Sequence, residues 1–287
     1  EYMFYSPFVS HYKPKLQINI VSNKWHCWVS NQGGHSLYSL FKKINADGRY
    51  FSELKDIVFV PTKKEKTESK IVVSLPSQYQ PLWVKSKSLF YNHAINFLRK
   101  RGLDDVDIKK YKIGFCDDGV YQNRIIVPSY DENGLLNYFV GRSFMGGMKY
   151  KNPRSSKNVV FNDLFTNWND DLVIVEGVFD AINAGNAVPI LGSTLRTDSD
   201  LLRKIVRNDT PCYIALDPDA AEKERKIIQT LLRYDVELYK IDVSGYEDVG
   251  EMPKATFQQR KQSAKLIDRD NYICLLYTSD AADEIAS

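Results

Sequence analysis

The sequence predicts an α/β fold built on a parallel sheet, and two segments carry that prediction. Segments Asp171–Asp180 (DLVIVEGVFD) and Tyr213–Asp219 (YIALDPD) each run from an unbroken apolar stretch of strand length into carboxylates. Such runs are typical of buried parallel strands that end at one edge of a sheet. From 171 to 245, short apolar runs alternate with helix-length segments, which favours parallel strands joined by right-handed crossovers.

This alternation also gives each element its expected bounds. We expect strands at 172–176, 187–191, 212–217 and 236–241. Between them we expect helices at 178–184, 197–207 and 219–234. Pro253 is suited to the first turn of a further helix that ends near residue 266.

Carboxylates follow both of the acid-bearing strands. Glu176 ends the first strand, Gly177 allows a sharp turn, and Asp180 falls in the first turn of the next helix. Asp217 and Asp219 flank a proline, so both can face one crevice. If the two strands are neighbours, these four acids converge, and hard oxygen ligands suit Mg²⁺ or Mn²⁺. The alternative is a sheet whose strand ends carry ordinary solvated acids.

The motif series VEGVFD, LGST and ALDPDAA resembles the Toprim domain, a metal-binding α/β module of bacterial-type primases, topoisomerases and some nucleases. The resemblance implies that the metal ligands are Glu176, Asp180, Asp217 and Asp219. The segment 246–253 (YEDVGEMP) is similar to the segment that follows in primases, and it adds Asp248 as a further ligand. On this basis we assign residues 166–270 to a Toprim domain and its following helix.

Composition limits the classes of protein to consider. The chain has 287 residues, 43% of them hydrophobic, which is enough for one large or two to three small domains. Its net charge of +3 hides a segregation, because lysine and arginine crowd the part before residue 160. No run approaches the ~18 apolar residues of a membrane span, and the start is no signal peptide. We therefore expect a cytoplasmic protein, in the host cytoplasm if it is viral, with no membrane partner.

The four cysteines are Cys27, Cys116, Cys212 and Cys274. Their wide spacing favours reduced thiols over a disulfide framework.

Residues 1–45 predict a small β module. Alternating segments at 15–20 and 24–29 suggest a hairpin, and 33–41 suggests a short helix. The layout resembles the amino-terminal zinc ribbon of bacteriophage primases, in which a Trp-rich strand contacts single-stranded template. The resemblance implies DNA contacts for Trp25 and Trp28.

The zinc knuckles of this ribbon are degenerate. Their positions hold Ser6, Val9, Cys27 and Ser30, so three of the four thiolates are absent. A closed zinc site needs four Cys or His ligands, and zinc is therefore not expected, with Cys27 as the remnant. An empty ribbon would depend on an apolar core, for which the candidates are Phe8, Leu16, Trp25 and Trp28.

Two segments are expected to lie outside the folded modules. Residues 46–88 are predicted to be a linker because 62–70 (TKKEKTESK) is charged and has no apolar period. A solvated helix face is the local alternative. The tail at 271–287 continues no earlier pattern and looks like translated sequencing adapter, so we expect it to be non-native and the natural protein to be cut short.

Residues 89–165 predict an α+β unit. We expect helices at 89–99 and 104–111 and strands at 112–116, 121–128 and 135–142, with a turn at 131–134. This unit resembles the basic subdomain of primases. The resemblance implies that the side chains facing nucleotide or DNA are Arg124, Arg142, Lys149, Lys151 and Lys157. For any one of them, a solvated surface cation is the alternative.

Together these motifs indicate a bacterial-type or bacteriophage DNA primase that makes short RNA primers on single-stranded DNA from ribonucleoside triphosphates. The catalytic residues implied are Glu176, Asp217, Asp219, Lys149 and Arg142. Metal ions and basic side chains suit such phosphoryl chemistry. A replicative helicase is an expected partner. A Toprim nuclease and a non-catalytic recombination mediator are the alternatives, and neither needs the lysine-rich unit upstream.

Overall fold

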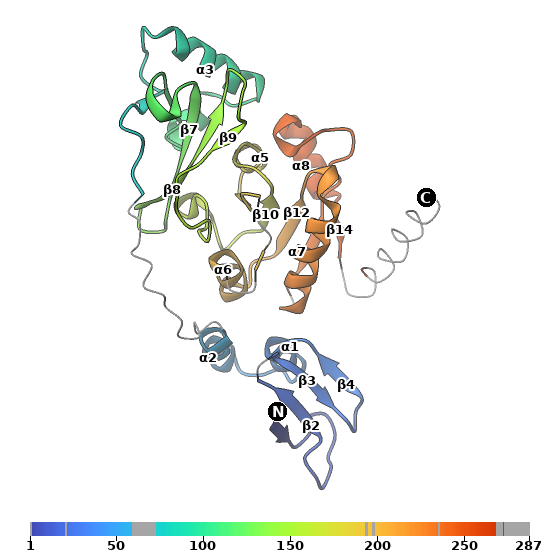
Figure 1. Ribbon diagram of the computed structural model, residues 1–287. Helices are drawn as coiled ribbons and strands as arrows, with labels where there is room; N and C mark the ends of the chain where they lie inside the picture. Colours follow the sequence, from blue (N-terminus) through green and yellow to red (C-terminus); the bar gives the residue numbers. More distant parts are fainter. Residues whose placement is uncertain are drawn as a thin grey trace.

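The computed structural model describes residues 2–20, 22–58, 73–192, 195–196, 199–234, 236–267 and 272. Within them the chain forms three sheets, one in each of three successive units (Figure 1). The charged middle of the predicted linker, at 59–72, and nearly all of the predicted tail, at 271 and 273–287, lie outside the described residues. No helix in the described part of the chain combines the length and apolarity that crossing a bilayer requires.

The amino-terminal unit is an antiparallel sheet with a helix against it, as the sequence predicts. Its strands lie side by side in chain order: β1 (Tyr2–Phe4), β2 (Leu16–Asn19), β3 (Lys24–Cys27) and β4 (Gln32–Gly34). Helix α1 (Leu37–Lys43) begins at Ser36, whose hydroxyl accepts a hydrogen bond from the Ser39 amide.

The small core of this unit differs from the prediction in one residue. Leu16, Trp25, Cys27 and Leu40 are buried together, and Phe8 packs against them. Trp28 was expected in this core but is 61% exposed. Side chains alternate between the two faces of a strand, so Trp25 and Cys27 point inward while His26 and Trp28 point outward.

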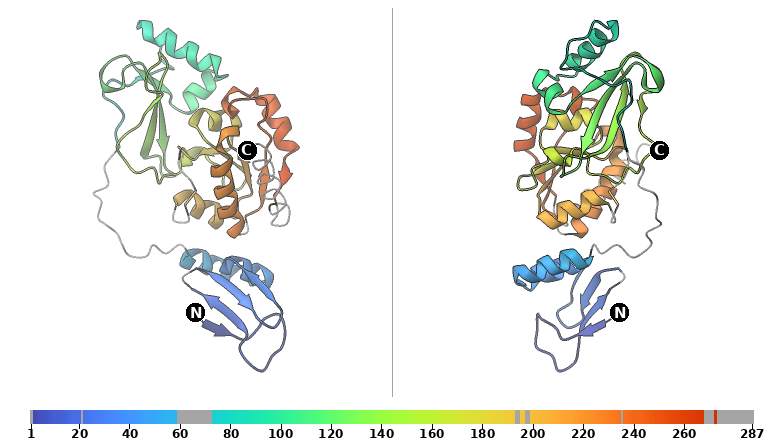
Figure 2. Two further views of the ribbon diagram at one scale, coloured as in Figure 1. Left: turned by 45° about the vertical axis from the view of Figure 1, so that its right-hand side comes forward. Right: turned by 90° about the vertical axis from the view of Figure 1, so that its left-hand side faces the viewer.

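A helix occupies part of the segment predicted to be a linker. Helix α2 (Gly48–Val58) packs Phe51 against the rings of Tyr38 and Phe41 on α1. These contacts, together with buried Leu54, hold the apolar side of the helix against α1. Figures 1 and 2 show the amino-terminal unit at the end of the molecule far from α3, next to α6. There the Tyr38 hydroxyl donates a 2.9 Å hydrogen bond to Asp209.

The middle unit is a five-stranded antiparallel sheet with helices α3 (Leu89–Lys100) and α4 (Asp105–Lys110). Its strands follow the order β5 (Gln80–Pro81), β6 (Gly114–Cys116), β7 (Arg124–Tyr130), β8 (Leu136–Ser143) and β9 (Tyr150–Lys151). Strand β5 also falls in the predicted linker. Gly141 allows β9 to pair with β8, because a Cβ there would lie 2.4 Å from the Lys151 carbonyl oxygen.

The third unit is the predicted parallel sheet, with the order β11-β10-β12-β13-β14. Strands β10 (Leu172–Val175), β11 (Ala187–Pro189), β12 (Cys212–Ala215) and β13 (Leu238–Lys240) are parallel. The short edge strand β14 (Lys265–Leu266) is antiparallel and was not predicted, since the last helix was expected to continue to about 266. The helices are α5 (Val178–Ala184), α6 (Asp200–Asn208), α7 (Ala221–Arg233) and α8 (Lys254–Gln262).

Side chains of alternate strand residues pack on opposite faces of this sheet. Leu172, Ile174 and Ile214 pack with α6 and α7 on one face. Val173 and Val175 pack with α5 and α8 on the other. Helix α5 also belongs to the core of the middle unit, where Phe179 meets Phe97 edge to face. The chain leaves β10 for β11 on one side and returns to β12 on the other, so the crevice between the ends of β10 and β12 is a topological switch point.

Three of the four cysteines fall in the described residues, and Cys27, Cys116 and Cys212 are all buried, unpaired thiols. For these three, the predicted reduced state is confirmed.

Candidate active site

Four of the five predicted acids face one pocket at the switch point. This pocket has a volume of about 350 Å³. Its acidic wall is formed by Glu176 after β10, Asp180 on α5, Asp217 after β12, and Asp248. The opposite wall comes from the β8–β9 region and the loop after it, with Lys149, Tyr150, Asn152 and Lys157. Asp219 is exposed and does not line the pocket, although its charge acts on Asp217.

Asp180 is held by the backbone on both sides. Its Oδ2 accepts a hydrogen bond from the Gly177 amide and its Oδ1 one from the Gly250 amide, both at 2.8 Å. A Cβ at Gly177 or Gly250 would lie 2.8 or 2.9 Å from these oxygens, so only glycine permits both contacts. The side chain is 6% exposed. Asp180 therefore joins the start of α5 to the Asp248 loop.

The loop that carries Asp248 is anchored from α5. The side-chain amide of buried Asn183 donates two hydrogen bonds of 2.7 Å, to the carbonyls of Val249 and Met252. Asp248 itself accepts a hydrogen bond from the Glu251 amide and so begins the short 3-10 helix at Val249–Glu251. Asn183 was not identified from the sequence, because an asparagine within a helix carries no signal of what it bonds.

The acids raise each other's proton affinity. Burial, followed by the charges of Asp180 and Glu176, raises the pKa of Asp217 from its ordinary 3.8 to about 7. Burial and the charge of Asp248 raise the pKa of Asp180 to about 6, despite its two amide hydrogen bonds. Asp217 Oδ1 is buried and has no hydrogen-bond partner. A bound cation would relieve this repulsion between carboxylates and would give the Asp217 oxygen a partner.

The expected divalent metal fits this donor set, since every candidate donor is a hard carboxylate oxygen. Among the described residues, however, no three acidic, histidine or cysteine side chains are already close enough together to bind one ion. Two of the candidate acids are engaged by other groups. Asp180 is engaged by backbone amides, and Glu176 is paired with the Lys223 ammonium at 3.0 and 2.9 Å.

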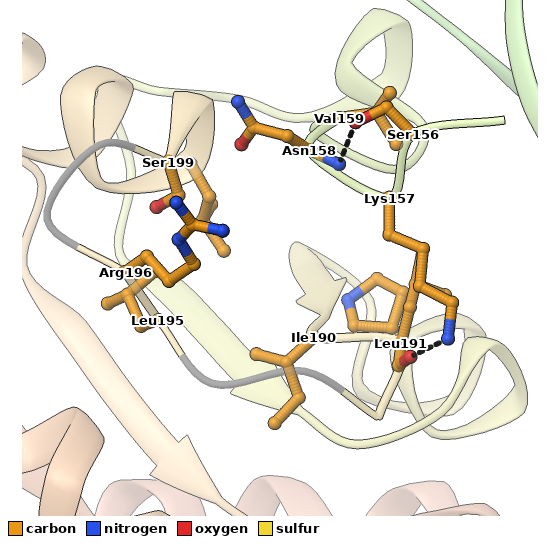
Figure 3. A pocket seen from close by; sticks show the side chains of 11 residues that line it. Ser156, Lys157, Asn158, Val159, Ile190, Leu191, Leu195, Arg196 and Ser199 are labelled. Carbon is orange, nitrogen blue, oxygen red and sulfur yellow. Dashed lines mark hydrogen bonds between the residues drawn. The ribbon is translucent and has the colours of Figure 1, made fainter.

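The lysines expected to face nucleotide divide into two groups. Lys149 and Lys157 line the acidic pocket, and Lys157 Nζ donates to the Leu191 carbonyl at 3.3 Å. Lys157 and Leu191 also line a second cavity of about 250 Å³ beside α6, toward which Figure 3 shows Arg196 pointing. Lys151 lies over the Tyr121 ring instead, outside the pocket lining.

The two arginines of the basic unit also differ. The Arg142 guanidinium lies 4.8 Å from the Tyr150 ring centroid, and its Nε and Nη1 are buried without partners. Arg124 is 9% exposed and donates to the carbonyls of Gly141 and Met148. Arg124 thus stabilises the connection between β8 and β9 through buried hydrogen bonds. Arg142 keeps donors that a phosphate beside Tyr150 could use.

The predicted DNA-contacting tryptophans point to opposite sides of the amino-terminal sheet. Trp25 is 3% exposed and donates from Nε1 to Ser39 Oγ, so it belongs to the core. Exposed Trp28 lies edge to face with His26, with ring centroids 4.6 Å apart. Only Trp28 is available for stacking on a base.

The degenerate knuckle is filled by hydrogen bonds. The Cys27 thiol lies 3.2 Å from Ser6 Oγ, which accepts from the amides of Phe8 and Val9. Burial raises the pKa of Cys27, but the nearby serine hydroxyls and backbone amides outweigh it and bring the value to about 7. Neutral hydroxyls and one thiol do not make a closed zinc site, so the residues present do not fit the metal.

Lys223, the partner of the pocket acid Glu176, was missed by sequence reasoning. It occupies the third position of α7, where acids are favoured because the helix dipole is positive there. A lysine at this position interacts unfavourably with the helix dipole, and it lies six residues after the predicted catalytic residue Asp217. These two facts could have identified Lys223 from the sequence. Arg101 was also missed. It lies over the rings of Phe97 and Phe179, and its charge acts on Asp180.

Comparison with known proteins finds similarity to primases. No family model matches the chain. A DNA primase of Campylobacter jejuni is 26% identical over 269 residues, covering 75% of this chain and 44% of the relative. A DNA primase of Legionella pneumophila is 25% identical over 276 residues, covering 76% of this chain and 46% of the relative. The chain thus spans about half the length of the curated relatives it matches.

Solved structures show the same fold. The Aquifex aeolicus primase, comprising its zinc-binding and RNA polymerase domains, matches with a TM-score of 0.55 at 18% identity, covering 93% of this chain and 79% of that one. The DnaG primase catalytic domain bound to single-stranded DNA matches with a TM-score of 0.55 at 19% identity, covering 67% and 76%. These matches confirm the predicted fold class and the resemblance to bacterial-type primases.

Proposed function

We propose that this chain acts as a DNA primase that joins ribonucleotides into short primers on a single-stranded DNA template. One observation carries the proposal: a wall of carboxylates and a wall of cations face each other across one pocket at the switch point between β10 and β12. Such a pocket suits a reaction in which phosphate charge must be bound while one P–O bond forms and another breaks. The motifs and the named relatives agree with this assignment.

Each wall has a separate part in the reaction. Glu176, Asp217 and Asp248 are the residues that would hold Mg²⁺ or Mn²⁺, with Asp180 positioning the loop of Asp248 and exposed Asp219 available from the rim. The metal, when bound, stabilises negative charge on the attacking and leaving oxygens. Lys149 and Lys157 neutralise the phosphates of the incoming nucleotide from the opposite wall. Arg142 donates its free N–H groups to a phosphate beside Tyr150.

The template and other partners follow from the same assignment. A structural relative is a catalytic domain bound to single-stranded DNA, and exposed Trp28 offers a stacking surface for an unpaired base. The proposed substrates are ribonucleoside triphosphates. The proposal also includes Toprim-type metal chemistry and a replicative helicase as partner. It further includes a bacteriophage source and a cytoplasmic site of action.

The test is synthesis of primers. Protein is incubated with single-stranded DNA, labelled ribonucleotides and Mg²⁺, and the products are sized on a denaturing gel. Oligoribonucleotides that require template and disappear with Asp217→Asn support the proposal. Shortening of the DNA itself would identify a nuclease, and binding of DNA without any product would favour a recombination mediator. Either result would overturn the assignment.

A further inference from the structure

We propose that Lys223 is a positioning residue that holds Glu176 in the metal-free protein and competes with the divalent ion for that carboxylate. The pairing is bidentate, with Lys223 Nζ 3.0 Å from Oε1 and 2.9 Å from Oε2 of Glu176. The two side chains are 27% and 18% exposed. The inference rests on the proposed function only through its requirement for a metal.

The surroundings explain why a cation is needed at this point. Glu176 follows β10 and belongs to a group of carboxylates that, together with burial, raise the pKa of Asp217. Asp180 is stabilised by two amides, and Asp217 Oδ1 has no partner. Glu176 is the acid of this wall for which the structure records a bidentate ammonium contact. Lys223 thus neutralises part of the wall from the side of α7.

A divalent ion at the same carboxylate changes that balance. Both Glu176 oxygens now contact the ammonium, so an ion bound by Glu176 must take at least one of them. The ion and the ammonium also repel each other at close range. Binding of the metal must therefore weaken the Lys223 contact, and Lys223 must weaken metal binding.

The chain offers a matched control on the same helix. Lys226 pairs with Glu222 one turn away, at 2.6 Å, with side chains 58% and 79% exposed. Lys226→Gln removes a lysine of α7 whose recorded partner, Glu222, is not one of the pocket acids. Lys223→Arg is a second control because it keeps the positive charge at Glu176.

The experiment measures Mn²⁺ binding by calorimetry, or by the free-ion EPR signal, without nucleotide or DNA. Lys223→Gln should bind Mn²⁺ about tenfold more tightly than the natural sequence, because the ammonium that contacts both Glu176 oxygens is removed. Lys226→Gln and Lys223→Arg should stay within about threefold of it. Unchanged or weaker binding by Lys223→Gln would overturn the inference and would indicate that Lys223 supports the site or binds phosphate instead.

A double-mutant cycle separates a direct effect on Glu176 from general electrostatics. In a Glu176→Gln background the gain from Lys223→Gln should shrink to less than about threefold. A full tenfold gain in that background would refute the role of Glu176. Because no step depends on primer synthesis, a protein that makes no primers but shows these Mn²⁺ affinities would refute the proposed function and leave the role of Lys223 intact.

Discussion

Asp217→Asn should abolish primer synthesis and at the same time stabilise the metal-free protein. The pKa of Asp217 is raised from 3.8 to about 7, so the folded state disfavours the ionised form. A group with a raised pKa contributes most below its unfolded value, and that contribution is lost as pH rises through the folded value. The cost of ionised Asp217 is thus complete above pH 7 and absent below about pH 4. Asparagine keeps the volume and removes this cost.

The magnitude follows from the size of the shift. A change from 3.8 to about 7 corresponds to ~4 kcal/mol at ~1.4 kcal/mol per pKa unit. Because Asp217 is only partly buried, water screens the interaction, and we expect ~1–2 kcal/mol. For a protein of this size each kcal/mol moves Tm by about 2–4 °C.

The assay is thermal unfolding in EDTA between pH 4 and pH 8.5, followed by circular dichroism. Asp217→Asn should unfold several degrees above the natural sequence at pH 8, and the gap should close as pH falls toward 4. Mg²⁺ should raise the Tm of the natural sequence, because an ion that binds the folded state stabilises it. The Tm of the variant should stay nearly unchanged, because the variant lacks one of the carboxylates that would bind the ion. Equal or lower stability of the variant at pH 8 in EDTA would refute the reasoning, because burial and the neighbouring carboxylates would then not disfavour ionised Asp217.

Three further predictions test other parts of the chain. Protein purified without chelator should contain no stoichiometric zinc; near-stoichiometric zinc that disappears with Cys27→Ser would show that the knuckle has been misread. Lys149→Ala and Arg142→Ala should each weaken nucleotide or template use about tenfold or more, with Arg142→Lys restoring only part, and single-stranded DNA binding should fall steeply with salt; salt-insensitive binding would mean that these cations form a merely solvated face. Asn183→Ala should lower the free energy of unfolding by ~2–3 kcal/mol in denaturant titration, because two buried carbonyls lose their donor; a change under ~0.5 kcal/mol would show that the Asp248 loop does not depend on it.

The sequence was sufficient for the parallel sheet because buried parallel strands are apolar on both faces. Leu172–Val175 and Cys212–Ala215 are such runs, and the acids that end them identify the pocket. The helix at 48–58 was missed because the prediction of a linker was extended to it from the charged run at 62–70, although its apolar residues recur at helical spacing. What no local pattern reports is the packing of Phe51 on α1, a contact between two segments.

Individual side chains were harder to place than the elements that carry them. Arg124 and Arg142 lie on neighbouring strands, yet one is bonded inside the β8–β9 connection and the other keeps unpaired donors. Trp25 and Trp28 belong to one motif and differ by strand parity, which alternation could have revealed. Lys223 came from a helix that sequence reasoning treated only as a crossover. The burial and partner of a charge are set by tertiary packing, and a motif gives only its position along the chain.

Helix α5 is shared by two cores, and this makes the unit boundary expected near residue 165 a poor place to divide the chain. Phe179 and Ile182 pack into the middle unit, while Ala181 and Ala184 pack under the parallel sheet. A fragment beginning at 166 would expose the apolar face of α5 that contains Phe179 and Ile182. A fragment ending at 165 would expose the core residues of the middle unit that this face covers. Expressed separately, the halves would tend to aggregate. A protease nick between 166 and 171 would leave two pieces that stay together until denaturant separates them.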